Sequence, residues 1–137
     1  MSFPAPDITP LNKPYWDGLQ EGELRYQRCK SCGNCWLPAR ESCPRCLAAD
    51  AEWVQARGRG KILSWVVYHT AYHDAFADRV PYDVTLVELD EGPRLLTNII
   101  NGERGKILKI GAVVELAIER EGDLALARFK LTDAGDA

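Results

Sequence analysis

The stretch that decides the fold is Cys29-Lys30-Ser31-Cys32, which is followed ten residues later by Cys43-Pro44-Arg45-Cys46. Each Cys-x-x-Cys pair bends over a tight turn and points both sulfurs the same way, so two pairs can bring four thiolates to one ion. A tetrahedral set of four sulfurs is what zinc prefers in structural sites. The pattern therefore predicts a zinc ribbon with Cys29, Cys32, Cys43 and Cys46 as ligands. The gap is shorter than the ~15–20 residues of the commonest pattern, but a short β-hairpin spans it.

The chain has a fifth cysteine, Cys35, which could compete for a place in the zinc site. Gly33 directly follows Cys32, whereas Trp36 follows Cys35. Glycine tolerates the positive φ that such a turn needs and tryptophan does not, so we expect Cys35 outside the shell, as a spare thiol or a small buried residue. Five ordinary core cysteines or disulfides are the alternative, which the doubled spacing and the lack of a secretory signal disfavour.

Charge is laid out unevenly along the 137 residues. The net charge is -3, yet residues 25–61 hold eight Lys or Arg against three acids, and residues 62–137 hold thirteen acids against eight bases. We therefore expect a basic ribbon beside an acidic domain. With 46% hydrophobic residues, the chain can bury one modest core and carry a small metal-stapled module. The N-terminus lacks the features of a signal peptide and no run of about 18 apolar residues occurs, which predicts a soluble, cytoplasmic protein.

The N-terminal part reads as an extended arm followed by a short helix. Residues 1–11 contain three prolines, Asn12 is a plausible N-cap, and residues 13–21 form a helical stretch that Gly22 stops. Tyr15, Trp16 and Leu19 then share one face. So short a helix is marginal alone, and it must dock this face on the core of the chain or on a partner.

The rest of the chain predicts β-structure. Residues 23–27 and 36–40 flank the cysteine motif as strands, and short β-runs broken by turn residues follow. Residues 90–93 and 120–123 are good hairpin turns, whereas residues 106–111 read as either a helical turn or a strand start. We expect a mainly β fold with an arm and helix at residues 1–24, a zinc ribbon at 25–50, and a five- or six-stranded OB-type Greek-key barrel at 51–137. The expected strands from residue 51 onward are 52–56, 60–71, 82–89, 94–100, 112–119 and 124–131.

A polar segment at residues 72–81 separates the strands expected at 60–71 and 82–89. Loops of this length are often functional. It contains His73 and Asp74, with His69 just before it. Such a histidine pair could serve acid–base chemistry or a second metal, but it is more often structural or solvated. The segment also holds two apolar residues, Phe76 and Val80, with no strand to pack behind them.

The order of these parts resembles the acyl-CoA-associated family that joins a rubredoxin-like zinc ribbon to an OB-fold. The residues that carry the resemblance are Gln27 to Gly33, Leu37 to Arg40, Cys43 to Cys46, Gly58 to Ser64, Pro81 to Val84, Leu86 to Gly92 and Ile110 to Val114. The family usually has a second proline where this chain has Ala39 and no cysteine at the position of Cys35, and neither departure touches the expected ligands. The resemblance implies a small subunit without chemistry of its own, which binds a thiolase-like or, next, a hydratase-like enzyme acting on acyl-CoA esters.

Two further expectations follow from this resemblance. Arg40 and Arg45 lie among the ligands and could hold the phosphates of coenzyme A, or they could merely solvate the ribbon or pair with a partner's acids. A partner would be bound through apolar residues of the helix and of the polar segment. The expected interface residues are Tyr15, Trp16, Leu19, Phe76 and Val80.

Two other classes of function compete with this interpretation. A single-stranded nucleic-acid-binding module would stack bases on aromatics such as Trp65, Tyr68 and Tyr72, but the acidic balance of residues 62–137 argues against it. A free-standing hydrolase or thiolase would need a nucleophile with an oriented base, and nothing pairs Cys35, the sole candidate, with a histidine.

Overall fold

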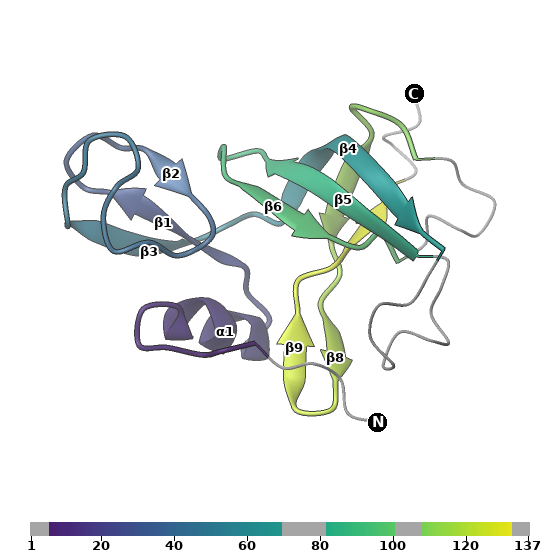
Figure 1. The fold of residues 1–137 in the computed structure, drawn as a ribbon, viewed down its shortest axis with the longest axis horizontal. Helices are drawn as coiled ribbons and strands as arrows, with labels where there is room; N and C mark the ends of the chain where they lie inside the picture. Colours follow the sequence, from purple (N-terminus) through teal and green to yellow (C-terminus); the bar gives the residue numbers. More distant parts are fainter. Residues whose placement is uncertain (1–5, 70–81, 101–107, 133–137) are drawn as a thin grey trace.

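The computed structural model describes residues 6–69, 82–100 and 108–132. Figure 1 shows a small three-stranded ribbon at one end of the molecule, a larger barrel at the other, and the helix α1 lying beneath the ribbon. The expected mainly β architecture, with one short helix, a zinc ribbon and an OB-fold, is therefore confirmed. No helix among the described residues is long and apolar enough to cross a membrane.

The helix α1 spans Lys13–Gln20 and begins and ends close to where the sequence predicts. Pro14 occupies its first turn, where the missing N–H costs nothing, and Gly22 ends it with a φ of 87°. Asn12 is at the N-cap, but its side chain makes no cap hydrogen bond to the helix; Asn12 Oδ1 accepts from the Thr9 N–H at 2.7 Å instead. Leu19 is completely buried, so α1 docks on the core of this chain.

The ribbon sheet consists of β1 (Arg25–Cys29), β2 (Cys35–Trp36) and β3 (Ala51–Gln55) in the antiparallel order β2-β1-β3. Two expectations differ here. The returning strand expected at residues 36–40 is only Cys35–Trp36, and it ends before Pro38, which has no backbone N–H for the ladder and was expected to stop the pairing. The run expected to open the barrel, residues 52–56, pairs instead with β1 over its whole length, so β3 belongs to the ribbon sheet.

The barrel sheet consists of β4 (Arg59–Tyr68), β5 (Tyr82–Leu89), β6 (Arg94–Thr97), β7 (Val113–Leu116) and β10 (Phe129–Leu131). Their order is β10-β7-β4-β5-β6, and a parallel bridge between Ile99 and Phe129 closes the sheet into a barrel. This Greek-key arrangement of five strands is that of an OB-fold. The separate hairpin of β8 (Glu119–Glu121) and β9 (Leu124–Leu126) projects from the barrel toward α1 (Figure 1).

Both predicted hairpins are confirmed: residues 90–93 connect β5 and β6, and within the predicted 120–123 the turn itself is Gly122-Asp123, between β8 and β9. Three expected strands are shorter or divided. Regular pairing of 94–100 with β5 stops at Thr97, 112–119 divides into β7 and β8, and 124–131 divides into β9 and β10. Each division lies where the chain leaves one sheet for another, which the alternation of apolar residues does not reveal.

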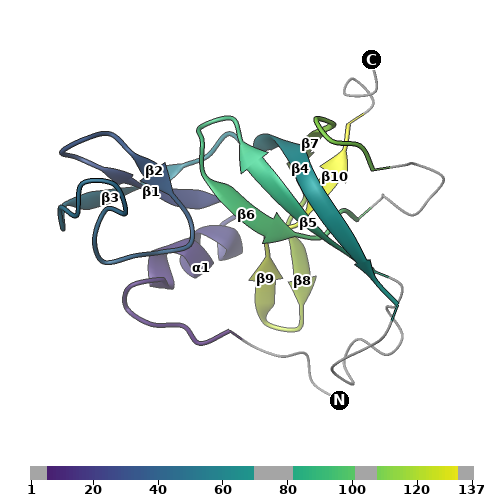
Figure 2. The same ribbon diagram turned by 45° about the horizontal axis from the view of Figure 1, so that its top comes forward.

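One apolar core runs through the helix, the ribbon and the barrel. Leu19 of α1 and Leu24 and Tyr26 of the ribbon belong to the same buried cluster as Ile62 and Phe129 of the barrel. The turned view in Figure 2 shows α1 and the ribbon strands standing against the barrel. The barrel and the ribbon are therefore held together by packing, and a second, smaller cluster around Cys29, Trp36 and Cys43 lies inside the ribbon.

A buried carboxylate reinforces the closure of the barrel. Asp83 of β5 is 7% exposed, and its two oxygens accept from the Ile99 N–H at 3.2 and 3.0 Å and from Thr85 Oγ1 at 2.5 Å. Asn98 Nδ2 also donates to the Asp83 carbonyl. Because a buried charge is tolerated only where hydrogen bonds replace water, Asp83 has a structural part in fixing the chain that follows β6 onto β5.

Candidate metal centre and adjoining groove

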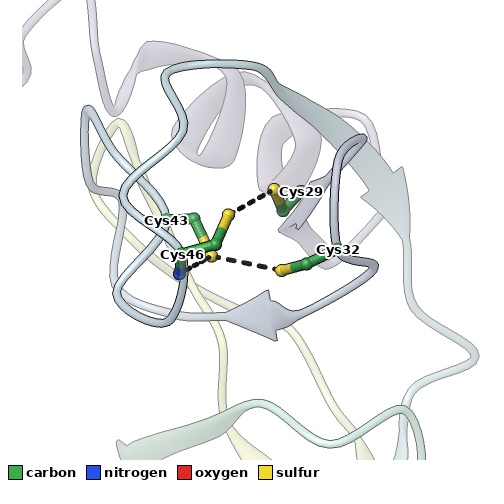
Figure 3. Close-up of side chains that lie close together, drawn as sticks. All are labelled: Cys29, Cys32, Cys43 and Cys46. Atoms are coloured by element: carbon green, nitrogen blue, oxygen red, sulfur yellow. Dashed lines mark hydrogen bonds between the residues drawn. The ribbon is translucent and has the colours of Figure 1, made fainter.

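The four cysteines of the double motif converge at one end of the ribbon (Figure 3). The Cys29 and Cys46 sulfurs are 3.6 Å apart, as are those of Cys32 and Cys43, and all four sulfurs lie within 4.8 Å of one another. Four sulfurs held about 2.3 Å from one zinc ion in a tetrahedron would be about 3.8 Å apart. The spacing fits zinc and is too long for a disulfide, whose sulfurs are about 2 Å apart.

The two Cys-x-x-Cys turns, here called the knuckles (residues 29–34 and 43–48), have the same backbone pattern. In the first, the Gly33 N–H donates to the Cys29 carbonyl at 2.9 Å and the Cys29 N–H donates to the Asn34 carbonyl at 2.8 Å. In the second, the Leu47 N–H donates to the Cys43 carbonyl and the Cys43 N–H donates to the Ala48 carbonyl, both at 2.9 Å. This repeated turn is what aims each pair of sulfurs at a common point.

Positive φ angles complete the knuckles. The sequence predicts a positive φ for the residue after Cys32, and Gly33 has a φ of 78°. Its counterpart in the second knuckle, Leu47, has a φ of 68°. A leucine in this conformation is strained because its Cβ approaches the following carbonyl. The Leu47 side chain is also 76% exposed, so packing within the described part of the chain does not compensate for this strain.

Backbone N–H groups favour the thiolate at two of the ligands. At Cys29, N–H groups of Cys32 and Ser31 lower the pKa of the thiol. Burial alone would raise the pKa of Cys43, but the N–H groups of Cys46 and Arg45, 3.4 and 3.3 Å from its sulfur, outweigh burial and lower the pKa to about 6.

At Cys46 the neighbouring sulfurs shift the pKa of the thiol in the opposite direction. The Ala48 N–H favours its thiolate, but hydrogen bonding to the sulfurs of Cys29, Cys32 and Cys43 outweighs this and raises the pKa of Cys46 to about 12. Four adjacent thiolates repel one another, so the last proton leaves only when a positive ion takes its place. The donor set, all sulfur and tetrahedrally spaced, is the one that structural zinc takes.

Cys35 lies outside the metal cluster, on β2. Its sulfur lies 3.6 Å from the Gly33 carbonyl, and burial raises the pKa of its thiol. A thiol held in its neutral form is a poor nucleophile. This agrees with the expectation that Cys35 is a spare, partly buried thiol.

The two arginines expected to meet coenzyme A, Arg40 and Arg45, are both exposed on the loops around the metal cluster. Neither forms an ion pair with any residue of the described part, whereas Arg28 of the same ribbon pairs with Glu52 at 3.2 Å. The loop that carries Arg40 is held by a buried glutamine, since Gln27 Oε1 accepts from the Trp36 Nε1–H at 2.8 Å and from the Arg40 N–H at 2.7 Å.

The expected interface residues of the helix divide into two groups. Leu19 is fully buried in the core and is not available to a partner. Tyr15 and Trp16 are half-buried, with their rings edge to face at 5.0 Å, and they line an open groove. Burial raises the pKa of Tyr15 to about 12, so its hydroxyl stays protonated at physiological pH.

This groove was not predicted from the sequence. It has a volume of about 430 Å³ and lies between α1, the ribbon loop that follows β2, and the β5–β6 hairpin. No local pattern could reveal it, because its walls come from three separate parts of the chain. The lining residues, which we call the groove residues, are Asn12, Tyr15, Trp16, Leu37, Pro38, Ala39, Leu86, Arg94, Leu95 and Leu96.

Other residues singled out in the sequence lie elsewhere. Phe76, Val80, His73, Asp74 and Tyr72 fall outside the described residues. His69 is exposed at the end of β4. Trp65, one of the aromatics considered for base stacking, is half-buried and packs against the core.

A zinc ribbon packed on an OB-fold barrel defines the class of protein. Comparison with family models gives the family: residues 16–52 match "ChsH2, rubredoxin-like zinc ribbon domain" and residues 53–119 match "ChsH2, C-terminal OB-fold domain". The chain belongs to the DUF35/ChsH2 family, as its sequence motifs predict.

Several relatives cover much of the chain. A "DUF35 domain-containing scaffold protein" of Methanothermobacter thermautotrophicus is 35% identical over 74% of this chain and 75% of its own length. A "Probable enoyl-CoA hydratase alpha subunit" of Thermomonospora curvata is 37% identical over 93% of this chain, which spans only 39% of that relative. "Benzoylsuccinyl-CoA thiolase subunit BbsA" of Thauera aromatica is 27% identical over 69% of this chain and 65% of its own length.

A solved structure has the same fold over nearly the whole chain. The structure described as "Ltp2-ChsH2(DUF35) aldolase" superposes with a TM-score of 0.81 and 34% sequence identity, covering 93% of this chain and 98% of that chain.

Proposed function

We propose that this chain is a zinc-stabilised, non-catalytic subunit that completes an acyl-CoA-processing enzyme complex and helps to bind or position the CoA ester. The observation that carries the proposal is the end-to-end similarity to the DUF35 chain of the aldolase structure. The absence of any nucleophile–base pair among the described residues supports a non-catalytic part, since Cys35 is held neutral and Asp83 is occupied by structural hydrogen bonds.

For the partner we propose a thiolase-like enzyme first and a hydratase-like enzyme next. Both kinds of enzyme are named among the relatives. The thiolase subunit of Thauera aromatica is matched over 65% of its length, whereas the hydratase subunit of Thermomonospora curvata is matched over only 39%. The zinc-ribbon and OB-fold unit therefore makes up most of the thiolase relative but a smaller part of the hydratase relative, which favours the thiolase-like partner for this unit.

Arg40 and Arg45 are proposed to hold the phosphates of the CoA tail. Both side chains are exposed and without an ion pair in the described part of the chain, and the ribbon that carries them is basic. An exposed arginine with no acidic partner is available for charge-assisted hydrogen bonds to phosphate. Ala39, next to Arg40, lines the groove, so a CoA ester held by Arg40 would pass close to the groove.

The proposed partner interface is formed by Tyr15 and Trp16 of α1 together with Phe76 and Val80, which lie outside the described residues. Half-buried aromatic residues beside a groove are the type enriched at interface hot spots. Phe76 and Val80 follow β4 in the sequence, and near the end of β4 the successive residues Val66 and Val67 are 54% and 44% exposed. Neighbouring strand residues point to opposite faces, so this end of β4 is apolar and uncovered on both faces within the described part of the chain.

The test is to produce the chain alone and together with any thiolase-like or hydratase-like enzyme subunit that is encoded beside its gene. The isolated chain should turn over no acyl-CoA ester, and it should form a stable complex with one of those subunits and raise its activity. Robust thiolysis or hydration by the isolated chain, free of contaminating enzyme, would overturn the accessory role.

The arginine assignment has its own test in that complex. Arg45→Gln should raise the KM for an acyl-CoA ester about tenfold, the loss expected for one hydrogen bond to a charged group. The KM for the matching acyl-pantetheine, which lacks the phosphates, should not change. Arg28→Gln is the matched control, because Arg28 is an exposed ribbon arginine already paired with Glu52. An equal effect of Arg45→Gln on both substrates would refute the phosphate contact.

A further inference from the structure

The strand β6 lies at one edge of the barrel sheet, and its backbone groups alternate between two sides. The hydrogen bond from the Leu89 N–H to the Pro93 carbonyl, 2.8 Å, makes these two residues a hydrogen-bonded pair of the β5–β6 ladder. Such pairs recur at every second residue in an antiparallel ladder. The N–H and C=O groups of Leu95 and Thr97 therefore face β5, and those of Arg94 and Leu96 face outward.

Just after β6, the outward-facing backbone groups are hydrogen-bonded to Phe129. Asn98 accepts from the Phe129 N–H at 3.2 Å, and Ile100 donates to the Phe129 carbonyl at 2.9 Å. These bonds confirm the alternation, because residues 98 and 100 have the same parity as 94 and 96. Just before Phe129 the chain makes one more contact with β6, where Thr97 Oγ1 donates to the Ala127 carbonyl at 2.8 Å, and it then joins the β8–β9 hairpin (Figure 1). No strand of the described chain therefore covers the outward groups of Arg94 and Leu96, which we call the open edge.

The open edge borders the groove. Arg94, Leu95 and Leu96 are groove residues, and Leu96 is 68% exposed. The other walls, from α1 and from the ribbon loop at residues 37–39, are mostly apolar or aromatic. A volume of about 430 Å³ has room for a few side chains. The site therefore combines two features: the outward backbone donors and acceptors of the open edge, which no strand of the described chain pairs, and the apolar groove beside them.

We propose that the open edge of β6 binds an extended segment of the partner enzyme subunit by β-strand addition, with apolar side chains of that segment seated in the groove. This inference rests on the proposed function for the existence of the partner and adds the way in which it is held. Main-chain hydrogen bonds to a sheet edge supply affinity in this mode, and pockets for alternate side chains supply specificity.

The site fits a thin, extended segment better than a second copy of this chain. A second copy would offer its own β6 together with the ribbon loop and helix that line the groove beside it, a surface much wider than a single strand. An extended segment needs only the width of one strand, about 4.8 Å from its neighbour.

The first test is residue-resolved amide hydrogen exchange on the ¹⁵N-labelled chain, alone and in complex with the acyl-CoA enzyme subunit. Strand addition should slow exchange at Arg94 and Leu96 about tenfold or more, while Leu95 and Thr97, already bonded to β5, are protected in both states. Simple coverage by side chains would protect neighbouring residues without this alternation, and that result would overturn strand addition.

The second test is a pair of variants at one position. Leu96→Pro removes an N–H that points outward and leaves the β5–β6 ladder intact, since proline is tolerated on edge strands with this orientation. Leu96→Thr keeps the N–H and removes the same apolar side chain. Both should fold with wild-type barrel structure, and Leu96→Pro should bind the enzyme subunit about tenfold or more weakly than Leu96→Thr.

The outcomes separate this inference from the proposed function. Equal affinity of the two variants overturns strand addition while leaving the accessory role in place. A wild-type chain that binds no acyl-CoA enzyme subunit refutes the accessory role itself. Loss of a homodimer in Leu96→Pro, seen by light scattering, would show that a second copy occupies the edge and would likewise overturn the proposal.

Discussion

Cys43 is the most enclosed of the zinc ligands, with no exposed surface and N–H groups of Arg45 and Cys46 directed at its sulfur. We expect Cys43→Ser to lose zinc and to unfold the ribbon, because structural zinc contributes about 10–16 kcal/mol in small zinc domains. The barrel should keep its β-structure but lose some stability, since Ile62 and Phe129 lie in a cluster separate from that of Cys29 and Cys43, whereas Tyr26 of the ribbon belongs to the cluster of the barrel. Elemental analysis and circular dichroism of the purified variant measure both effects.

Cys35→Ser is the matched control, since Cys35 is a cysteine of the same ribbon that lies outside the cluster. It should retain one zinc ion per chain and wild-type stability within about 1 kcal/mol. Zinc lost from Cys35→Ser but kept by Cys43→Ser would mean that the ligand set is wrong.

Leu47 and Gly33 occupy equivalent positions in the two knuckles with φ angles of 68° and 78°. We expect Leu47→Gly to stabilise the chain by about 1 kcal/mol, because glycine takes this conformation without the steric cost of a Cβ. Gly33→Ala should destabilise it by a similar amount, since no atom within 4 Å of the added Cβ would clash and only the backbone strain changes. Denaturant unfolding of the zinc-loaded variants measures both, and a destabilised Leu47→Gly would show that the exposed leucine side chain is needed within the chain.

At the scale of elements, the close antiparallel pairing of β4 with β5 depends on Gly60. A Cβ at this position would lie 2.5 Å from the Glu88 carbonyl oxygen and 2.8 Å from Val87 Cγ1. Because a backbone oxygen cannot rotate away, Gly60→Ala should force the two strands apart and cost about 1–3 kcal/mol, in the range of other overpacked sites. Thermal unfolding measures the loss. Ser64→Ala, an exposed change in the same strand, should stay within about 0.5 kcal/mol of wild type, and an equally stable Gly60→Ala would contradict the close approach.

Local signals in the sequence predict the elements well and their partners poorly. Several predicted features depend only on contacts or backbone angles within a few residues, and the structure has them: the convergence of the four cysteines, the positive φ of Gly22 and Gly33, and the two hairpin turns. By contrast, residues 52–56 alternate like a barrel strand but pair with β1. Alternation tells which face of a strand is buried and does not tell which neighbour it joins.

The groove and the open edge lie beyond sequence reasoning for the same reason. Tyr15 and Trp16, Leu37 and Pro38, and the β6 residues are separated by some twenty to eighty positions and meet only because α1, the ribbon and the barrel share one core. The helix face was expected to dock on either the core or a partner. In the structure this helix face does both: Leu19 is buried in the core, whereas Tyr15 and Trp16 line the groove.

At the scale of the whole molecule, α1 acts as the element that joins the other two. Leu19 lies in the common core. The end of the helix contacts the β8–β9 hairpin, where the Arg120 guanidinium donates to Gln20 Oε1 at 2.5 Å and to the Gln20 carbonyl at 3.1 Å. On the opposite side Arg25 of β1 donates to the Pro14 carbonyl at 3.2 Å. The width of the groove is therefore set by how α1 is seated between ribbon and barrel.

This arrangement predicts that two neighbouring changes in α1 will separate stability from partner binding. Leu19→Ala removes a fully buried side chain and should lower the free energy of unfolding by about 2–5 kcal/mol. Trp16→Ala removes a half-buried ring from the wall of the groove, so it should lower the free energy of unfolding less than Leu19→Ala does. It should weaken binding to the enzyme subunit more, by about 2 kcal/mol, as for an interface hot spot. Thermal unfolding and calorimetric titration, at a temperature where both variants are folded, give the two quantities. A Trp16→Ala chain that is strongly destabilised yet binds its partner with normal affinity would show that the ring serves the core alone, and the groove would then lose its place in the interface.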